Sequence, residues 1–383
     1  MVARSATVVL KKDLSRTLRQ GHPWLFREAI AGSPGLPTGS LVAIADKHGR
    51  DIAFGYWDAT SPIAVRVLDL DRVGDPEALV QRRLQAALAI RLAHLDLHTT
   101  NTFRWVHGEG DRLPGIHVDV YANTVSVRFD GKGSRAFYRN LPDVLRASAA
   151  GLGVRKVFDR EARGQGSEEI RVVENGVRFI VDVGRGQKGG LFLDQRENRQ
   201  AVAARAQGKS LLNLFGYTGG FSIYAAAAGA RRTDTVDIAQ PAIAAARRNF
   251  EHNGLDLDQA GFHATDAFRF LEEAVERKDT WDIVVSDPPS FAPSKGSLPA
   301  ARRAYLRLHR LAAQVVAPGG LLCAASCSSH FPRRDFLTSV EAGVRQAGRA
   351  FVLESYTSAG FDHPSLPVFP EGDYLKFAVG KLR

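Results

Sequence analysis

The sequence predicts an α/β protein whose C-terminal part, from residue 184 onward, folds as a doubly wound parallel sheet. Three observations carry this prediction. From Leu211 onward, short apolar segments alternate with helical ones, which is typical of strands joined by crossover helices. A glycine-rich turn at 216–220 joins the first such strand to an Ala-rich helix. The next strand ends in an acid, Asp237, and ligands bind outside the carboxyl ends of such strands.

Two further domains are expected before this sheet, because 383 residues exceed what one compact domain usually holds. Residues 1–72 contain short β-type runs separated by Gly and Pro, which predict a small β-barrel. Residues 73–183 predict a central α/β domain. Its expected helices are 75–96 and 134–149, and its expected strands are 103–106, 116–121, 124–129, 154–160, 169–174 and 177–183.

The expected elements of the third domain begin with a glycine-rich and basic loop at 184–190. A helix should start near Asp194, whose carboxylate suits the positive end of the helix dipole. The expected strands are 211–215, one ending at Asp237, one ending near His263, 281–286, 321–326 and 374–379.

Composition limits the classes of function. A hydrophobic content of 44% and a charged content of 24% are typical of a soluble globular protein, and no apolar run predicts a membrane span or signal peptide. Two cysteines do not make a disulfide framework, so we expect a reducing, cytoplasmic location. The net charge of +10 favours an anionic partner such as nucleic acid, or it reflects a general bias toward basic residues. Residues 1–50 hold eight Lys or Arg against three acids.

The N-terminal segment resembles a PUA domain, an RNA-binding module. The resemblance rests on Gly-His-Pro-Trp-Leu-Phe at 21–26, Gly-Ser-Leu-Val at 39–42 and Ser-Pro-Ile-Ala-Val-Arg-Val at 61–67. A basic barrel with exposed aromatic side chains could hold an RNA backbone and stack bases. We expect at least one of Trp24 and Phe26 to lie in the barrel core instead.

The glycine turn predicts a nucleoside site. Gly216, Gly219 and Gly220 let a ligand approach the backbone, and Asp237 suits hydrogen bonds to ribose hydroxyls. The spacing fits neither G-x-G-x-x-G nor the phosphate loop G-x-x-x-x-G-K-[ST]. A glycine turn of this kind resembles the S-adenosylmethionine (SAM) site of class I methyltransferases. The alternative is a structural turn that binds nothing.

Three further features fall at the same predicted edge. Asp266 follows the third strand, where it could bond an adenine amino group or cap the next helix. Asp-Pro-Pro-Ser-Phe at 287–291 follows the fourth strand, and its two prolines hold the carboxylate of Asp287 in a rigid loop. Cys323 and Cys327 are four residues apart and so share one face of a regular strand. Only Cys327 reaches the ligand-binding edge, and a zinc site with His330 lacks a fourth ligand, so no metal is predicted.

These segments together resemble the bacterial SAM-dependent 23S rRNA 5-methylcytosine methyltransferases. The resemblance rests on Phe-Leu-Asp-Gln-Arg-Glu-Asn-Arg at 192–199, Asn-Leu-Phe-x-Tyr-Thr-Gly-Gly-Phe at 213–221, Asp-Pro-Pro-Ser-Phe at 287–291 and Ser-Cys-Ser-Ser-His at 326–330. That family joins a PUA domain, a central α/β domain and a Rossmann-like class I methyltransferase domain, here 1–72, 73–183 and 184–383. Two residues depart from related patterns. Ser290 stands where many 5-cytosine methyltransferases have a second cysteine, and Asn213 stands where many SAM sites have an acid.

The resemblance implies the chemistry and the site residues. The Cys327 thiolate would attack C6 of cytosine, so that C5 can accept the methyl group of SAM, while Asp287 stabilises charge on the ring. The residues expected to bind SAM are Phe192, Asp194, Arg196, Asn213, Phe215, Tyr217, Thr218, Gly219, Asp237, Ile238, Asp266, Ala267 and Asp287. The residues expected to contact the target base are Lys188, Pro288, Pro289 and Phe291. The expected partner is ribosomal RNA, either 23S rRNA or a large-subunit precursor, with no membrane contact, and the chain could form a homodimer.

Three alternatives stay open at the level of sequence. A methyltransferase acting on a guanine nitrogen of rRNA also uses an Asp-Pro-Pro loop but needs no cysteine. An RNA-binding assembly factor would make little use of SAM, against which the glycine turn, Asp237 and Cys327 argue. A small-molecule methyltransferase would have no need of the basic N-terminal domain.

Overall fold

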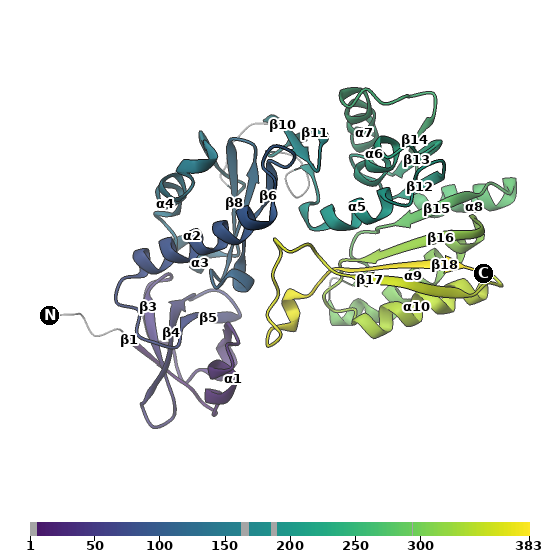
Figure 1. Ribbon diagram of the computed structural model, residues 1–383. Helices are drawn as coiled ribbons and strands as arrows, with labels where there is room; N and C mark the ends of the chain where they lie inside the picture. Colours follow the sequence, from purple (N-terminus) through teal and green to yellow (C-terminus); the bar gives the residue numbers. More distant parts are fainter. Residues whose placement is uncertain (1–5, 162–167, 185–189, 293) are drawn as a thin grey trace. The chain divides into compact units, whose positions relative to one another are not determined.

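The computed structural model describes residues 6–161, 168–184, 190–292 and 294–383. The chain forms two compact units, each with its own sheets (Figure 1). The first unit is Met1–Gly166 together with the later segment Phe361–Gly372, and the second is Ser167–Gly360 together with Asp373–Arg383. Within the described ranges, no helix combines the length and the apolar character needed to cross a membrane.

The N-terminal part of the first unit is the small barrel that the sequence predicts. Its five strands lie in the order β1-β3-β4-β5-β2. An isolated antiparallel bridge joins Leu10, directly after β1, to Ile30, which follows β2 by four residues, and it brings the chain beyond the two outer strands together. The elements are β1 (Ala6–Val9), α1 (Ser15–Arg19), β2 (Trp24–Phe26), β3 (Leu41–Ala45), β4 (Asp51–Trp57) and β5 (Ile63–Asp69).

The expectation that Trp24 or Phe26 lies in the barrel core is wrong. Successive side chains of a strand point to opposite faces, and β2 turns Leu25 inward, with 1% of its surface exposed. Phe26 is therefore 41% exposed. Trp24 is half-buried, because its ring packs edge-to-face on Phe369 and its indole N–H donates to Glu109 Oε1 at 2.7 Å.

The rest of the first unit is a four-stranded sheet, in the order β6-β7-β8-β9, with three helices. These elements are α2 (Pro76–His94), β6 (Thr102–His107), β7 (Ile116–Tyr121), β8 (Thr124–Phe129), α3 (Lys132–Phe137), α4 (Leu141–Ser148) and β9 (Lys156–Asp159). The single helix predicted at 134–149 is two helices. Pro142 lies in the first turn of α4 and has no N–H to continue a helix from α3. Barrel and sheet share one core, in which Phe54 and Tyr56 of β4 pack with Leu84 and Trp105.

The second unit is built on a seven-stranded sheet in the order β14-β13-β12-β15-β16-β18-β17. The strands β14, β13, β12, β15 and β16 are parallel, and β18 is antiparallel to both of its neighbours. The strands are β12 (Ser210–Leu214), β13 (Arg232–Asp237), β14 (Ala260–Ala264), β15 (Trp281–Ser286), β16 (Val316–Ser326), β17 (Phe351–Thr357) and β18 (Lys376–Leu382). The helices are α5 (Arg196–Ala203), α6 (Gly220–Ala227), α7 (Gln240–His252), α8 (Ala267–Arg277), α9 (Leu298–Gln314) and α10 (Arg333–Gln346). The predicted doubly wound sheet is confirmed, and the expected strand at 281–286 has both of its predicted ends.

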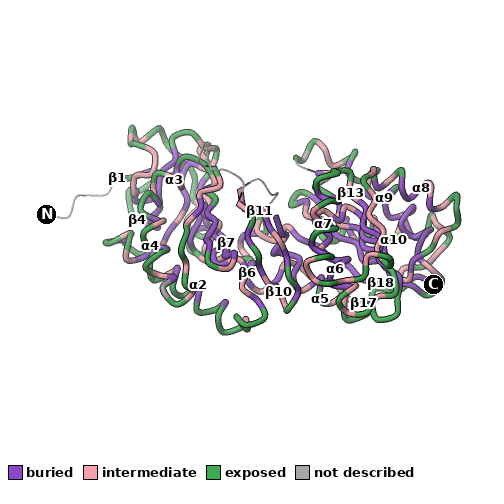
Figure 2. Tube along the Cα trace, turned by 90° about the horizontal axis from the view of Figure 1, so that it is seen from above, coloured by how far each residue is buried: buried purple, intermediate pink, exposed green. Residues whose placement is uncertain are grey.

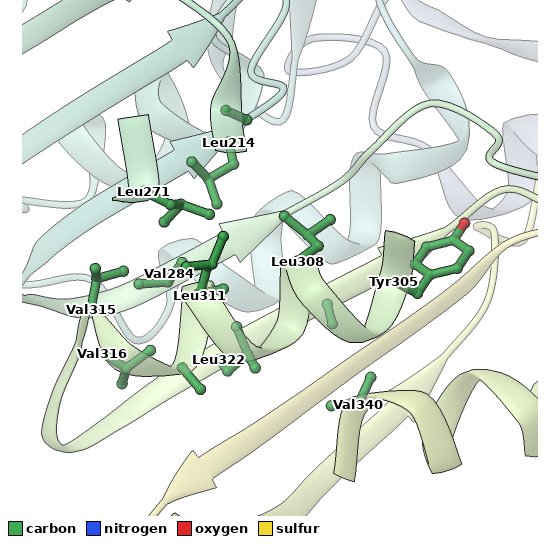
Figure 3. Close-up of a cluster of buried hydrophobic side chains, with 14 of the residues drawn as sticks. Leu214, Leu271, Val284, Tyr305, Leu308, Leu311, Val315, Val316, Leu322 and Val340 are labelled. Carbon is green, nitrogen blue, oxygen red and sulfur yellow. The ribbon is translucent and has the colours of Figure 1, made fainter. Parts of the chain in front are cut away.

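Alternate residues of the central strands face two separate cores. Leu212 and Leu214 of β12 pack with helices α8, α9 and α10, whereas Leu211 packs with α5 and α6 on the other face. Figure 3 shows the first of these cores, with Leu308 and Leu311 of α9 among the strand side chains. In Figure 2 the trace of the strands is mostly buried, and exposed residues follow the outer sides of the helices.

A two-stranded hairpin, β10 (Glu169–Glu174) and β11 (Val177–Asp182), also belongs to the second unit, although the sequence analysis assigns it to the central segment. It is joined to α5 and α6 by a buried ion pair. Glu174 has none of its surface exposed and accepts from Arg199 at 2.6 and 2.8 Å. The Tyr224 hydroxyl donates to the same carboxylate at 2.8 Å. Burial beside Glu174 raises the pKa of Tyr224, so its hydroxyl keeps its proton.

Replacing Glu174 with Ala is expected to destabilise the second unit by about 3–5 kcal/mol, because Arg199 would stay buried without its counter-charge. A lower midpoint of urea unfolding checks this. Glu169→Ala is the matched control, since Glu169 lies on the same strand in an exposed pair with Arg248 and should cost less than about 1 kcal/mol. Equal effects of the two substitutions would contradict the expectation.

Candidate active site

A cleft of about 1090 Å³ opens within the second unit at the carboxyl ends of β12, β13, β15 and β16. The sequence predicts site residues in several segments. Each of these segments that the structure describes contributes residues to the cleft lining. The predicted residues in its lining are Phe192, Asp194, Asn213, Phe215, Tyr217, Thr218, Asp237, Ile238, Asp266, Ala267, Asp287, Pro288, Pro289, Phe291 and Cys327.

Three predicted site residues are not among these. Gly219 caps α6 with φ of 85°, and a Cβ there would lie 3.0 Å from Ala246 Cβ, so it faces α7. Arg196 is buried, with 2% of its surface exposed, and pairs with Glu197 at 2.7 Å. Lys188 lies outside the described residues.

The turn between β12 and α6 is tightly wound and glycine is needed in it. Phe215 and Tyr217 have φ values of 57° and 46°, in the left-handed region. A Cβ on Gly216 would meet Thr235 Cγ2 at 2.6 Å and Asn213 Nδ2 at 2.9 Å. Glycine at 216 therefore lets the turn pack closely on Thr235 and Asn213, and the turn residues 215–218 line the cleft.

Asp237 closes this turn from the end of β13. Its Oδ2 accepts from the Tyr217 N–H at 2.9 Å, and its Oδ1 accepts from the Ala239 N–H at 2.9 Å. Ile238 beside it is 73% exposed, the largest exposure among the large hydrophobic residues described. A held carboxylate next to an open apolar side chain suits a ribose diol with an adjacent flat ring.

Asn213 lies at the bottom of the cleft, with 1% of its surface exposed. Its Nδ2 donates to Ser222 Oγ at 3.1 Å. Its Oδ1 is buried and has no hydrogen-bond partner among the described residues. A buried acceptor of this kind costs free energy unless a donor fills the site, and the ammonium of a bound amino acid would do so.

Asp266 caps α8, as one of its two predicted roles requires. Its Oδ1 accepts from the N–H groups of Phe268 and Arg269 at 3.0 and 3.1 Å. Ala267 follows at the cleft wall, and Phe268 adds an aromatic ring to the lining that the sequence analysis did not identify.

The loop before α5 forms another wall. Phe192 packs edge-to-face on Tyr217, with 5.5 Å between ring centroids. Asp194 is buried and accepts from the Tyr374 hydroxyl at 2.5 Å.

Gln195 is a residue that sequence reasoning missed. Its Nε2 donates to Asp287 Oδ2 at 2.9 Å, and its Oε1 accepts from Asn198 at 2.7 Å. Gln195 and Asn198 lie in the segment 192–199 that carries the family resemblance. Their place in that segment was the sign by which Gln195 could have been found.

The two cysteines have different environments. Cys323 lies in the core with 1% of its surface exposed, and burial raises its pKa to about 12, as expected of an inert thiol. Cys327 comes one residue after β16 ends, so the two do not share a strand face as predicted. The Cys327 thiol is half-buried in the cleft and donates to the Pro288 carbonyl oxygen at 4.0 Å. Within the described parts of the chain, no three His, Cys, Asp or Glu side chains are arranged to hold a metal ion.

This cleft fits SAM. Asp237 would hold the ribose, Asn213 would accept from the methionine ammonium, and Phe192 and Ile238 would flank the adenosine. Together with the strand order, this defines the class: a class I, Rossmann-like methyltransferase.

Comparison with known proteins then identifies the family. A family model for S-adenosylmethionine-dependent methyltransferases matches residues 160–365, and one for PUA-like domains matches residues 8–70. Ribosomal RNA large subunit methyltransferase I of Alteromonas mediterranea is 34% identical over 98% of both chains. The protein of the same name from Aeromonas hydrophila is 36% identical over 99% of this chain and all of its own. The chain belongs to the family of ribosomal RNA large subunit methyltransferase I.

Solved structures share the fold over the whole chain. A SAM-dependent methyltransferase from Streptococcus mutans superposes with a TM-score of 0.82 at 22% identity, over 98% of this chain and 99% of its own. A methyltransferase solved in complex with SAH has a TM-score of 0.83 at 23% identity, over 99% of this chain and 100% of its own.

Asp237→Ala is expected to weaken SAM binding by about 1.5–3 kcal/mol, because charge-assisted hydrogen bonds to the ribose would be lost. Titration calorimetry with SAM measures this. Asp258→Ala serves as the control, because Asp258 is exposed and lies outside the cleft lining. The assignment fails if the two variants bind SAM equally well.

Proposed function

We propose that this chain methylates C5 of a cytosine in large-subunit rRNA, either 23S rRNA or its precursor, with Cys327 as the nucleophile. The observation that carries the proposal is the position of the Cys327 thiol, which lies 4.0 Å from the Pro288 carbonyl oxygen in the same cleft as the residues expected to bind SAM. A base held by the 287–291 loop would therefore meet a thiol.

The choice of RNA is supported by the relatives and by the first unit. The relatives are named as ribosomal RNA large subunit methyltransferases, and the N-terminal segment belongs to the PUA-like domains. The basic side chains near the N-terminus are available to phosphates, because Lys11, Lys12, Arg16 and Arg19 are all exposed.

Cytosine C5 is too weak a nucleophile to accept a methyl group unaided. Attack of the Cys327 thiolate on C6 forms a C–S bond and moves the ring π electrons to C5. Bound SAM would supply an electrophilic methyl group to C5, and its sulfonium would become a neutral thioether. Loss of the C5 proton to a base then returns an electron pair to the C5–C6 bond, and the C–S bond breaks to release Cys327.

Asp287 would assist the attack on C6. It follows β15 directly, and its carboxylate is oriented by the hydrogen bond from Gln195 at 2.9 Å. A proton held between the Asp287 carboxyl group and ring N3 would offset the negative charge that develops on the ring when C6 is attacked. Because the carboxylate is already held, little reorganisation is needed during the reaction.

The loop after Asp287 offers a rigid surface for the base. Pro289 is exposed, Pro288 is buried, and Phe291 is held against Tyr305 with 4.9 Å between ring centroids. The target base has to leave its stack to reach this loop.

A homodimer, a role for Lys188 and a cytoplasmic location stay predictions.

Cys327→Ala is expected to abolish 5-methylcytidine formation, by at least about a thousandfold, because the covalent step is lost. Methyl transfer from labelled SAM to unmodified bacterial rRNA, followed by mass spectrometry of the nucleosides, measures it. Cys323→Ala is the matched control, since that thiol is in the core and its removal should leave the product unchanged. A methylated guanosine formed equally by the native protein and Cys327→Ala would contradict the proposal.

A further inference from the structure

Lys376 is a buried lysine at the end of the sheet where Cys327 lies. It is the first residue of β18 and pairs in register with Ser326, the last residue of β16. Only 2% of its surface is exposed. Lysine is almost never this buried without a partner or a role, because its ammonium loses hydration.

The Lys376 ammonium is fixed at the Cys327 loop. Its Nζ donates to the carbonyl oxygen of Ser328 at 2.6 Å and to that of Tyr374 at 2.9 Å. Lys376 is thus paired with Ser326 through its backbone and bonded to Ser328 through its side chain. These are the two residues that flank Cys327.

Hydroxyl groups hold the same loop from the other side. The Tyr305 hydroxyl lies 2.8 Å from Ser326 Oγ and 3.3 Å from Ser328 Oγ, and Ser290 Oγ lies 2.9 Å from Ser328 Oγ. Figure 3 shows Tyr305 at the edge of the apolar core, with its hydroxyl directed away from the aliphatic side chains. The backbone around Cys327 is therefore clamped between the Asp-Pro-Pro loop and β18.

The charge of Lys376 also interacts with the Cys327 thiolate. Burial lowers the pKa of Lys376 to about 8, while the charges of Asp373 and Cys327 act to raise it and that of Arg333 acts to lower it. Arg333 and Asp373 pair with each other at 2.8 Å, so the larger effect of Asp373 is offset only in part by Arg333. Interaction between two titrating groups is reciprocal, so a cation that the thiolate stabilises also stabilises the thiolate.

Among the other described groups near this site, those with a negative charge do not favour the thiolate. Asp287 lines the same cleft with a carboxylate, and the charges of Asp287 and Cys327 both act to raise the pKa of Tyr305, which burial raises most. Lys376 is a described cation whose charge interacts with that of Cys327.

We propose that Lys376 is a positioning residue for Cys327. Its ammonium holds the 326–328 loop, and its charge stabilises the thiolate without touching the RNA. Lys376 is absent from the described lining of the cleft, which agrees with action through Cys327 rather than on the substrate. This inference rests on the proposed nucleophilic role of Cys327.

The test is the pH dependence of iodoacetamide alkylation at Cys327, followed by peptide mass spectrometry on the full chain without SAM or RNA. The native protein should react with a midpoint below about 8.5, the ordinary value for a cysteine thiol. Lys376→Met should shift the midpoint upward by about one pH unit, which makes alkylation at pH 7 about tenfold slower. Lys376→Arg keeps a cation and should restore part of the rate. Lys381→Met, an exposed lysine on the same strand, is the control and should match the native protein.

Coinciding profiles for the native protein and Lys376→Met would overturn the inference. If Lys376→Met does not fold, as judged by circular dichroism, the native profile decides alone: a midpoint at or above about 8.5 overturns it. Methyl transfer separates this inference from the proposed function. A native protein that forms no 5-methylcytidine refutes the cytosine reaction, whereas the alkylation profile still reports whether Lys376 activates the thiol.

Discussion

The buried ion pair between Arg199 and Glu174 is the interaction on which the cleft depends. Removing two charges from water is costly, and here the cost is offset by a bidentate pair at 2.6 and 2.8 Å and by a hydrogen bond from Tyr224. The same guanidinium donates to the Phe192 carbonyl at 2.9 Å, so it also fixes the cleft wall. Gly220 leaves room for it, because a Cβ there would lie 3.1 Å from Arg199 Cδ. Hairpin, cleft wall and glycine turn are thereby held at one point.

Strand direction explains how residues distant in the sequence meet at the cleft. β15 and β16 are parallel neighbours, so Asp287 and Cys327, which follow their carboxyl ends, are presented at the same edge. A parallel strand next to β16 would add another carboxyl end. Because β18 is antiparallel, it brings its amino end to this edge instead, and with it Lys376. The antiparallel strand β18 therefore brings the cation of Lys376 to the same edge as the loops that follow the parallel strands.

Local patterns predicted the elements of the sheet and the residues that follow its strands. The strand ending at Asp237 and the strand at 281–286 have the predicted carboxyl ends. The rule that ligands bind at those ends pointed to Asp237, Asp266, Asp287 and Cys327, which all line the cleft. Gln195 and Lys376 were missed because their importance comes from partners far away in the chain. The bond from Gln195 to Asp287 and the register of Lys376 with Ser326 have no local signal. The same is true of Phe361–Gly372, which packs with the first unit although the chain on both sides of it belongs to the second.

Ser290 shows how a departure from a family pattern can be read physically. Many 5-cytosine methyltransferases have a cysteine at this position, and the hydroxyl here lies 2.9 Å from Ser328 Oγ. A thiol is a weak donor and acceptor, so it would bind the two loops less firmly than a serine does. The sequence has two cysteines, and Cys323 is shut inside the core. The serine thus links the loop of Asp287 to the loop of Cys327, and Cys327 is the cysteine that lines the cleft.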